Sequence, residues 1–202
     1  MAFKIYLVRH GTTEYGVKGY TTGHKDIPLN EIGREQAHAT AEYLKDKGIS
    51  KIFSSSLSRA SETAKIISSK LDLTVREYDE FMEHSAGNLD GVPFIKFYDT
   101  LKKVGDFEQM IVQAEGEPSI EFKRRVWGKF LEIIQSNDDH ENILIVTHGG
   151  VCRLILLTIL ESNLGAGFYQ GNCCINIIEY DSERDDKFDF IIALVNYTDH
   201  LI

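Results

Sequence analysis

Two short apolar runs, one near each end of the chain, stop at the same dipeptide, His-Gly. Residues 3–8 read FKIYLV and lead into Arg-His-Gly at 9–11, whereas residues 142–147 read NILIVT and lead into His-Gly-Gly at 148–150. Runs of this length and composition are typical of buried strands. Because ligands of open α/β sheets bind just beyond the carboxyl ends of the strands, the repeated pattern predicts a functional site where these two runs end.

Strand-like and helix-like segments alternate along the rest of the chain. Further strands are expected at 49–53, 74–76, 173–180 and 188–195. Helices are expected at 30–47, ended by Gly48, at 118–136 and at 151–160. A further helix is expected after the second strand, capped by Ser58 or a neighbour, with an apolar stripe formed by Ala60, Ala64, Ile67 and Leu71. This alternation predicts a three-layer α/β/α sandwich with a mostly parallel sheet. The last two strands form a closing hairpin through the charged turn at 181–187.

The stretch 79–117 is the least periodic part of the chain. It begins as an irregular loop, and 93–113 is typical of short helices laid over the edge of the sheet. Prolines are few and no flexible linker occurs, so we expect one domain over 1–202, with 79–117 as a lid-like insertion that covers a site. Its aromatic residues either set substrate choice or pack in a core: Phe81, Phe94, Phe97, Tyr98 and Phe107.

Charge and composition exclude several classes of partner. The chain has 22 Lys and Arg against 31 Asp and Glu, a net charge of −9, which repels nucleic acid and anionic membranes. The N-terminus lacks the pattern of a secretory signal and no apolar stretch is long enough to span a bilayer, so a cytoplasmic protein is expected. The cysteines, Cys152, Cys173 and Cys174, show no disulfide framework, and we expect reduced, buried thiols.

Two arginines accompany the expected strand ends. Arg9 adjoins His10, and Arg59 opens the helix that follows the second strand. Planar guanidinium groups suit phosphate or carboxylate oxygens, so the pair can surround one anion. The alternative is a solvated Arg59 on a helix surface. Its position directly after Ser-Ser-Ser-Leu-Ser at 54–58 favours the anion site.

Four blocks together resemble a known family. They are LVRHGTTE at 7–14, TGHKDIPLNEIGREQA at 22–37, SSSLSRASETA at 54–64 and VTHGGVCRLIL at 146–156. Their order and content are similar to branch 1 of the histidine phosphatase superfamily, the branch that includes cofactor-dependent phosphoglycerate mutases. The resemblance spans roughly residues 5–180 and implies a phosphoglycerate mutase-like fold.

The resemblance also implies a role for each matching residue. His10 is the expected nucleophile, which becomes a phosphohistidine, and Glu83 is the expected proton donor. Arg9, Arg59 and His148 hold the phosphoryl oxygens and complete the catalytic set. The phosphate-binding residues that the resemblance implies are Arg9, Thr22, Gly23, Arg59, His148 and Gly149.

Some positions depart from the family pattern. Gly16 stands where an asparagine often contacts the phosphate, so that contact is in question. Asp90 stands where glutamate is commoner, Leu89 where tryptophan is usual, and Ser56 where aspartate is frequent.

The chemistry supports the same roles independently. An imidazole attacks only when neutral, so His10 needs its other ring nitrogen to donate to a fixed acceptor, and neighbouring cations help by lowering its pKa. Two arginines and a protonated His148 neutralise a phosphoryl group without a metal. No cofactor and no metal site are expected, and the remaining histidines are expected to be ordinary surface or loop residues: His24, His38, His84, His140 and His200.

We therefore expect a phosphatase that hydrolyses a small phosphomonoester. Mutases of this type usually carry extra length that closes the pocket, and 202 residues is short, so phosphoryl transfer of the mutase type is the alternative. A non-catalytic phosphate-binding protein is a further alternative. The expected partner is a small phosphorylated metabolite. The sequence allows either a monomer or a homodimer.

Overall fold

The computed structural model describes residues 2–137, 141–162, 168–183 and 189–201, and these form a six-stranded sheet in the order β3-β2-β4-β1-β5-β6. The strands are β1 (Ala2–Arg9), β2 (Ile49–Ser55), β3 (Val75–Tyr78), β4 (Asn142–Thr147), β5 (Ile175–Asp181) and β6 (Phe190–Tyr197). β1, β4, β2 and β3 are parallel, whereas β5 runs antiparallel to both of its neighbours. The expected mostly parallel sheet and its closing hairpin are confirmed, and the turn residues 184–188 lie outside the described residues.

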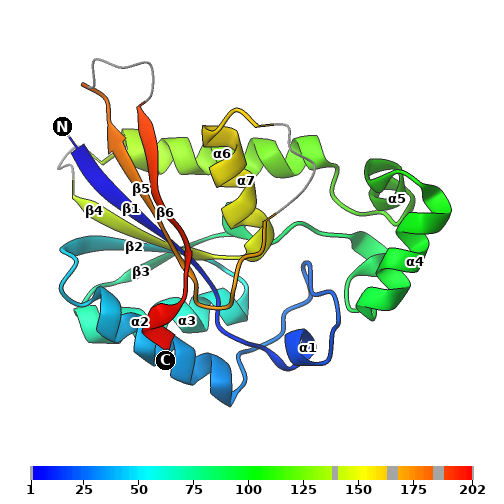
Figure 1. Cartoon of the computed structure of the whole chain (residues 1–202), viewed down its shortest axis with the longest axis horizontal. Helices are drawn as coiled ribbons and strands as arrows, with labels where there is room; N and C mark the ends of the chain where they lie inside the picture. The colour runs from blue at the N-terminus through cyan, green and yellow to red at the C-terminus, as the bar shows by residue number, and fades with distance from the viewer. Residues whose placement is uncertain (1, 138–140, 163–167, 184–188, 202) are drawn as a thin grey trace.

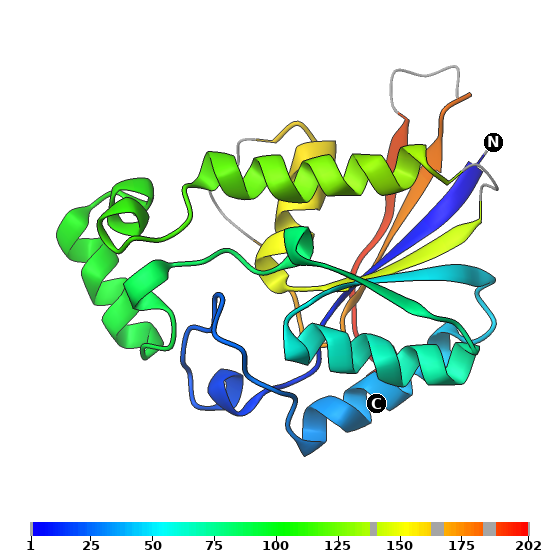
Figure 2. The same cartoon turned by 180° about the vertical axis from the view of Figure 1, so that it is seen from behind.

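Helices cover both faces of the sheet (Figures 1 and 2). The α-helices are α1 (Glu14–Val17), α2 (Glu31–Leu44), α3 (Ser58–Leu71), α4 (Phe94–Val104), α5 (Phe107–Gln113), α6 (Ser119–Gln135) and α7 (Gly149–Ile159). Short 3-10 turns are η1 (Asp79–Phe81), η2 (Gly87–Leu89) and η3 (Asp199–Leu201). Figure 1 shows α6 and α7 on one face and α2 and α3 on the other, which confirms the three-layer sandwich.

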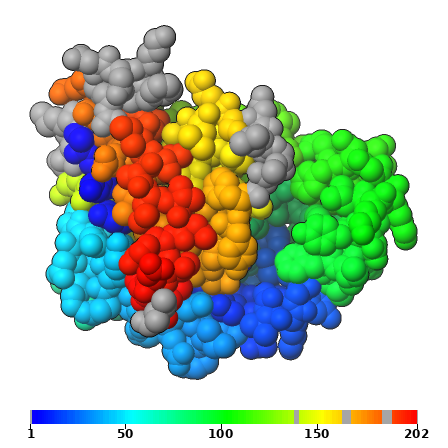
Figure 3. Space-filling model, viewed as in Figure 1, coloured from blue at the N-terminus to red at the C-terminus, as the bar shows by residue number. Residues whose placement is uncertain are grey.

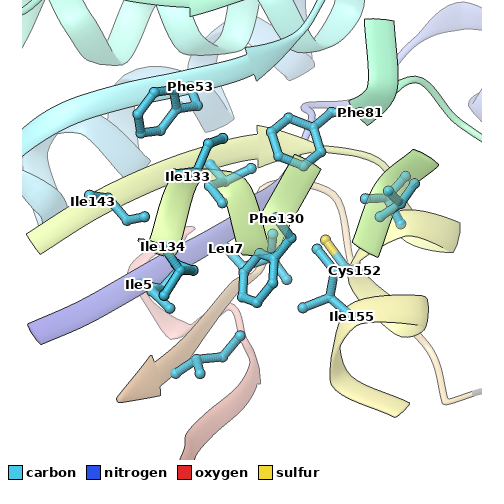
Figure 4. Close-up of a cluster of buried hydrophobic side chains, with 14 of the residues drawn as sticks. Ile5, Leu7, Phe53, Phe81, Phe130, Ile133, Ile134, Ile143, Cys152 and Ile155 are labelled. Carbon is cyan, nitrogen blue, oxygen red and sulfur yellow. The ribbon is translucent and has the colours of Figure 1, made fainter. Parts of the chain in front are cut away.

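The main core lies between the sheet and the α6/α7 layer. Figure 4 shows Ile5 and Leu7 of β1 facing Phe130 and Ile134 of α6, with Cys152 of α7 beside them. Each of these apolar side chains contributes about 1.5–3 kcal/mol on full burial. A second cluster on the other face includes Ala60, Ala64 and Ile67, three members of the expected stripe of α3. Both faces of the central strands are therefore packed, which fixes their carboxyl ends.

Two helix starts show where local pattern and structure differ. Asn30, the first residue of the expected helix, is the N-cap of α2, since its Oδ1 accepts from the N–H of Gly33 at 2.9 Å. Ser58, in contrast, is the first residue of α3, not its cap, and its hydroxyl has no partner among the described residues. The Ser58 N–H donates instead to Oδ1 of Asp26 at 2.7 Å. The acceptor at this helix start comes from a distant loop, which a local motif cannot reveal.

Other boundaries shift by a few residues. α2 ends at Leu44, earlier than the expected 47, and α7 begins at Gly149, earlier than the expected 151. β5 begins at Ile175, not 173, because Cys173 has a positive φ of 52° and leaves the extended conformation.

The expected short helices, α4 and α5, lie beyond the carboxyl ends of the strands, not along either edge strand of the sheet (Figures 1 and 2). They pack around a small cluster of their own, formed by Ala86, Leu89, Met110 and Ile111. Among the described residues, no helix is long and apolar enough to cross a membrane.

Candidate active site

The two His-Gly segments meet at the centre of the sheet. β1 and β4 are parallel neighbours in a register that pairs Arg9 with Thr147, so the residues that follow them lie side by side. The backbone N–H of His10 donates to the Thr147 carbonyl at 2.8 Å, and the rings of His10 and His148 are 5.1 Å apart between centroids. The residues predicted for a site at these two strand ends therefore lie together in one group, here called the strand-end cluster.

His10 is held in one tautomer. Its Nδ1 lies 2.7 Å from the carbonyl oxygen of Gly11, an atom that only accepts, so Nδ1 carries the proton and Nε2 keeps its lone pair. The side chain is 5% exposed. Burial, followed by the charges of Arg59 and Arg9, lowers the pKa of His10 well below its usual value of 6.5. The ring is neutral at physiological pH, as its expected role requires.

The two arginines lie next to this ring. Arg59 is fully buried and donates to the carbonyl oxygens of Gly23 and Lys25 at 2.8 and 2.9 Å, which excludes the solvated alternative. Burial lowers its pKa to about 10, so it stays charged at neutral pH. Arg9 donates through Nη1 to the Gln170 carbonyl at 2.5 Å. In each arginine Nε is buried and has no partner among the described residues, which leaves a donor available for an anion.

The surroundings of His148 favour a neutral ring over the expected protonated form. It is fully buried, and burial followed by the charge of Arg59 lowers its pKa well below 6.5. Nε2 lies 2.8 Å from the Ser55 hydroxyl, which itself accepts from the Leu57 N–H. The Ser55 hydroxyl can donate to Nε2 of His148 or accept from it, since its oxygen has two lone pairs. Nδ1 is buried and has no partner among the described residues, so no protein group competes with a bound anion for it.

Glu83 reaches the same cluster from the opposite direction. Its Oε2 accepts from the Gly150 N–H, in the first turn of α7, at 3.0 Å, and its Oε1 accepts from the His84 N–H at 2.9 Å. A Cβ atom on residue 150 would lie 2.2 Å from Oε1, so only glycine allows this approach. Glu83 also acts electrostatically on Arg59, where it opposes the effect of burial on the pKa.

The expected phosphate loop at Thr22 and Gly23 adjoins the cluster. Gly23 has a positive φ of 45°, and a Cβ there would lie 1.9 Å from Oδ1 of Asp90. Asp90 accepts from the His24 N–H at 3.0 Å and from the Ala86 N–H at 2.9 Å, so it ties the loop of Gly23 to the segment of Glu83. The Thr22 carbonyl accepts from the Lys25 N–H at 2.8 Å, and Gly149 borders the Arg9 side chain.

Two other positions, Ser56 and Gly16, also depart from the family pattern. Ser56 donates through its hydroxyl to Asp79. Gly16 is exposed in α1, and a Cβ there would meet only the Thr13 hydroxyl at 3.5 Å, an ordinary contact.

Several residues of the site were not selected from the sequence. Asn172 donates to the carbonyls of His10 and Gly11 at 3.1 and 3.2 Å. Asn176 is fully buried in β5 and joins Gln170, whose carbonyl accepts from Arg9, through a hydrogen bond of 2.8 Å. The sequence signal for Asn176 is a polar amide within an otherwise apolar strand.

Two histidines expected to be ordinary surface or loop residues are anchored beside Glu83. His24 donates through Nε2 to the Glu83 carbonyl at 2.7 Å, and His84 donates through Nε2 to the Glu117 carbonyl at 2.6 Å. The sequence offers no local signal for either contact. His140 lies outside the described residues.

A hollow opens on this side of the molecule. Figure 3 shows it between the orange segment before β5, the blue segment around α1 and the green α4. Of the aromatic residues in 79–117, Phe81 is fully buried and Phe97 packs against the small cluster, whereas Phe94, Tyr98 and Phe107 are exposed. Core packing is confirmed for Phe81 and Phe97, and a role of the exposed members in substrate choice stays a prediction.

Among the described residues, no three His, Cys, Asp or Glu side chains come together in a way that could hold a metal ion. The three cysteines are free and buried, and burial raises the pKa of Cys173 to about 12 and that of Cys174 to about 11. The expectation of buried thiols is confirmed.

Comparison with known proteins agrees with this geometry. A family model for the histidine phosphatase superfamily, branch 1, matches residues 5–188. The chain is 31% identical over 206 residues to the Saccharomyces cerevisiae protein named broad-specificity phosphatase YOR283W, which covers 98% of this chain and 87% of the relative. It is 32% identical to the Bacillus subtilis protein named uncharacterized phosphatase PhoE, with 89% of this chain and 90% of the relative covered.

Among solved structures, phosphoglycerate mutase from Bacillus anthracis superposes with a TM-score of 0.86 at 20% identity and covers 99% of this chain and 95% of its own. That likeness shows a shared fold. The family match, in turn, spans nearly the whole chain and includes the four sequence blocks at 7–14, 22–37, 54–64 and 146–156. The chain belongs to branch 1 of the histidine phosphatase superfamily.

Proposed function

We propose that this protein hydrolyses small phosphomonoesters through a phosphohistidine on His10. One observation carries the proposal: a neutral imidazole, fixed by the Gly11 carbonyl, lies beside two buried or partly buried guanidinium groups and a second imidazole. A nucleophile next to fixed positive charge is what phosphoryl transfer needs, because the transition state spreads negative charge over the equatorial oxygens.

The reaction then proceeds in two balanced steps. Nε2 of His10 attacks phosphorus, the bond from phosphorus to the ester oxygen breaks, and Glu83 gives its proton to that oxygen so that an alcohol leaves. Next, a water oxygen attacks the phosphohistidine, the Glu83 carboxylate takes a proton from that water, and the phosphorus–nitrogen bond breaks. Inorganic phosphate leaves, and both side chains return to their starting forms.

The phosphoryl oxygens are bound by the protein's own donors in this proposal. Arg9 and Arg59 supply the charge, and Nδ1 of His148 and the N–H of Gly149 supply further donors. Thr22 and Gly23 border the same phosphate. We propose that no metal ion takes part, since the two guanidiniums already neutralise a phosphate dianion.

The test is turnover of p-nitrophenyl phosphate with EDTA present, together with a rapid acid-free quench for a phosphorylated histidine. We expect wild-type turnover and an acid-labile adduct. His10→Gln should lose both, with kcat reduced more than about 10³-fold, as is usual for a removed nucleophile. His38→Gln, at an exposed position, is the matched control and should behave as wild type.

Two results would contradict the proposal. Absence of turnover between pH 5 and 8, despite phosphate binding, would indicate a non-catalytic binding protein. Interconversion of 2- and 3-phosphoglycerate stimulated by a bisphosphate, without release of inorganic phosphate, would indicate a mutase.

We further propose the setting of this activity. The substrate is a small phosphorylated metabolite in the cytoplasm, and neither nucleic acid nor a membrane is a partner, in keeping with the net charge of −9. The chain acts as one domain in which 79–117 forms a lid-like insertion over the site. The position of α4 and α5 beyond the strand ends supports this arrangement.

A further inference from the structure

Outside the strand-end cluster, one arginine has all of its guanidinium N–H donors in hydrogen bonds. Arg125, in α6, donates two hydrogen bonds to the Glu117 carboxylate at 2.6 and 2.7 Å. It also donates to the carbonyls of Glu80, Met82 and Glu83 at 2.9, 2.7 and 3.0 Å. These bonds match the full set of N–H donors that a guanidinium possesses.

The pair of Arg125 and Glu117 is well shielded. Their side chains are 20% and 16% exposed, and the Arg125 guanidinium lies 5.0 Å from the centroid of the Phe122 ring. A desolvated ion pair adds little net stability by itself, because removal of both charges from water offsets their attraction. The role of Arg125 therefore lies in its three hydrogen bonds to backbone carbonyls, not in the ion pair.

All three carbonyls belong to the short segment that ends at Glu83. This segment begins within η1 and is followed by an irregular loop. Phe81 anchors its first part, because its side chain is buried in the main core and its carbonyl accepts from Oγ1 of Thr147 at 2.8 Å. Met82 and Glu83 lie outside any helix or strand.

Arg125 ties Met82 and Glu83 to α6, whose neighbouring residues Phe122 and Val126 are buried in the main core. The Glu83 carbonyl has a second donor in His24, at 2.7 Å.

We propose that Arg125, held in place by Glu117, is a positioning residue that sets where the Glu83 carboxyl group meets the leaving oxygen. The inference rests on the proposed function, in which Glu83 is the proton donor. Arg125 itself touches no reacting atom. It fixes the backbone on one side of Glu83 while the Gly150 N–H fixes the carboxylate on the other.

The leaving group separates this role from a merely structural one. An alkyl phosphate such as phosphoserine releases a poor alkoxide and needs the proton, whereas p-nitrophenyl phosphate releases a stable phenolate and does not. The measured quantity is kcat/KM, because it reports the steps up to release of the leaving group and is independent of phosphohistidine hydrolysis.

Arg125→Lys keeps the charge but cannot reach all of these acceptors. We expect it to lower kcat/KM for phosphoserine by about 10- to 100-fold, since misplacing a proton donor by about 1 Å has that effect. For p-nitrophenyl phosphate the change should stay within about threefold. Glu117→Gln, which preserves shape, should show the same selectivity to a smaller degree and serves as the second variant if Arg125→Lys does not fold.

The matched control is Arg124→Lys. Arg124 is the preceding residue of the same helix, its side chain is 68% exposed, and its partner Glu121 is one turn away on the surface. We expect wild-type activity on both substrates.

A double variant completes the test. If Arg125 acts through Glu83, then adding Arg125→Lys to Glu83→Gln should cause no further loss on phosphoserine. Equal losses on both substrates, no loss on either, or an additional loss in the double variant would overturn the inference. Failure of the proposed function would instead appear as His10→Gln with wild-type turnover.

Discussion

The two sides of the site are built in different ways. His10 and His148 follow neighbouring strands whose register is set by the backbone ladder and by a core packed on both faces. Glu83 lies in an irregular segment, and its place is set by hydrogen bonds from Arg125, His24 and the Gly150 N–H. The nucleophile side is therefore positioned by the fold as a whole, and the acid side by a few individual hydrogen bonds.

This difference has a consequence for mutation. A change at the strand ends disturbs buried charges and the centre of the sheet, so stability and activity should fall together. A change around Glu83 disturbs local bonds in a segment outside the sheet, so activity can fall while the fold persists.

On the acid side, the largest effect is expected at Gly150, where activity should fall while stability is kept. In Gly150→Ala the new Cβ would lie 2.2 Å from Oε1 of Glu83, the flexible end of a side chain that can swing away. We expect kcat/KM for phosphoserine to fall about 10²- to 10³-fold, the usual contribution of a proton donor. The free energy of unfolding, measured with urea, should change by less than about 1 kcal/mol, because alanine suits a helix.

Gly149→Ala is the matched substitution for this comparison. Its Cβ would lie 3.5 Å from Nε of Arg9, an ordinary contact, and its N–H is retained. We expect a loss at least about tenfold smaller than that of Gly150→Ala. Equal losses would mean that the crowding of Glu83 is not the cause.

The contrast also explains how far the sequence predicted the site. The strands that carry His10 and His148 were predicted from local apolar runs, and their pairing follows from the parallel sheet. The role of Glu83 came only from family resemblance, because no periodic pattern positions it. Arg125 and Asn176 were missed, since their hydrogen bonds join segments 42 and 169 residues apart in sequence.

The strand-end side should also set the acid sensitivity of the fold. Burial lowers the folded-state pKa of both His10 and His148 well below 6.5, and that of His200 in the same direction. Below pH 6.5 the unfolded chain therefore binds protons that the folded chain does not, and stability falls as pH falls. Stability from these groups is fully present above that pH.

For pH 7.5 to 5.5 we expect a loss of about 1.4 kcal/mol for each of the two active-site histidines. Urea unfolding at each pH measures it. Acidic groups with lowered pKa values, such as Glu42 at about 2, titrate below this window. His10→Gln should remove about half of the pH dependence, and an unchanged dependence would place the titrating groups elsewhere.

The smallest expected effect concerns Gly16, on a third wall of the hollow. The residue is exposed, has no positive φ, and has room for a side chain next to Thr13. Gly16→Asn should add one amide donor toward the phosphate and lower KM for p-nitrophenyl phosphate by about three- to tenfold, with kcat within about twofold. Gly16→Ala is the control, because it adds a Cβ without a donor. If both variants lowered KM equally, backbone restriction of α1 would explain the gain. If neither did, phosphate binding would rest wholly on the strand-end donors. The contrast between a half of the site positioned by the fold and a half positioned by individual hydrogen bonds would then be sharper still.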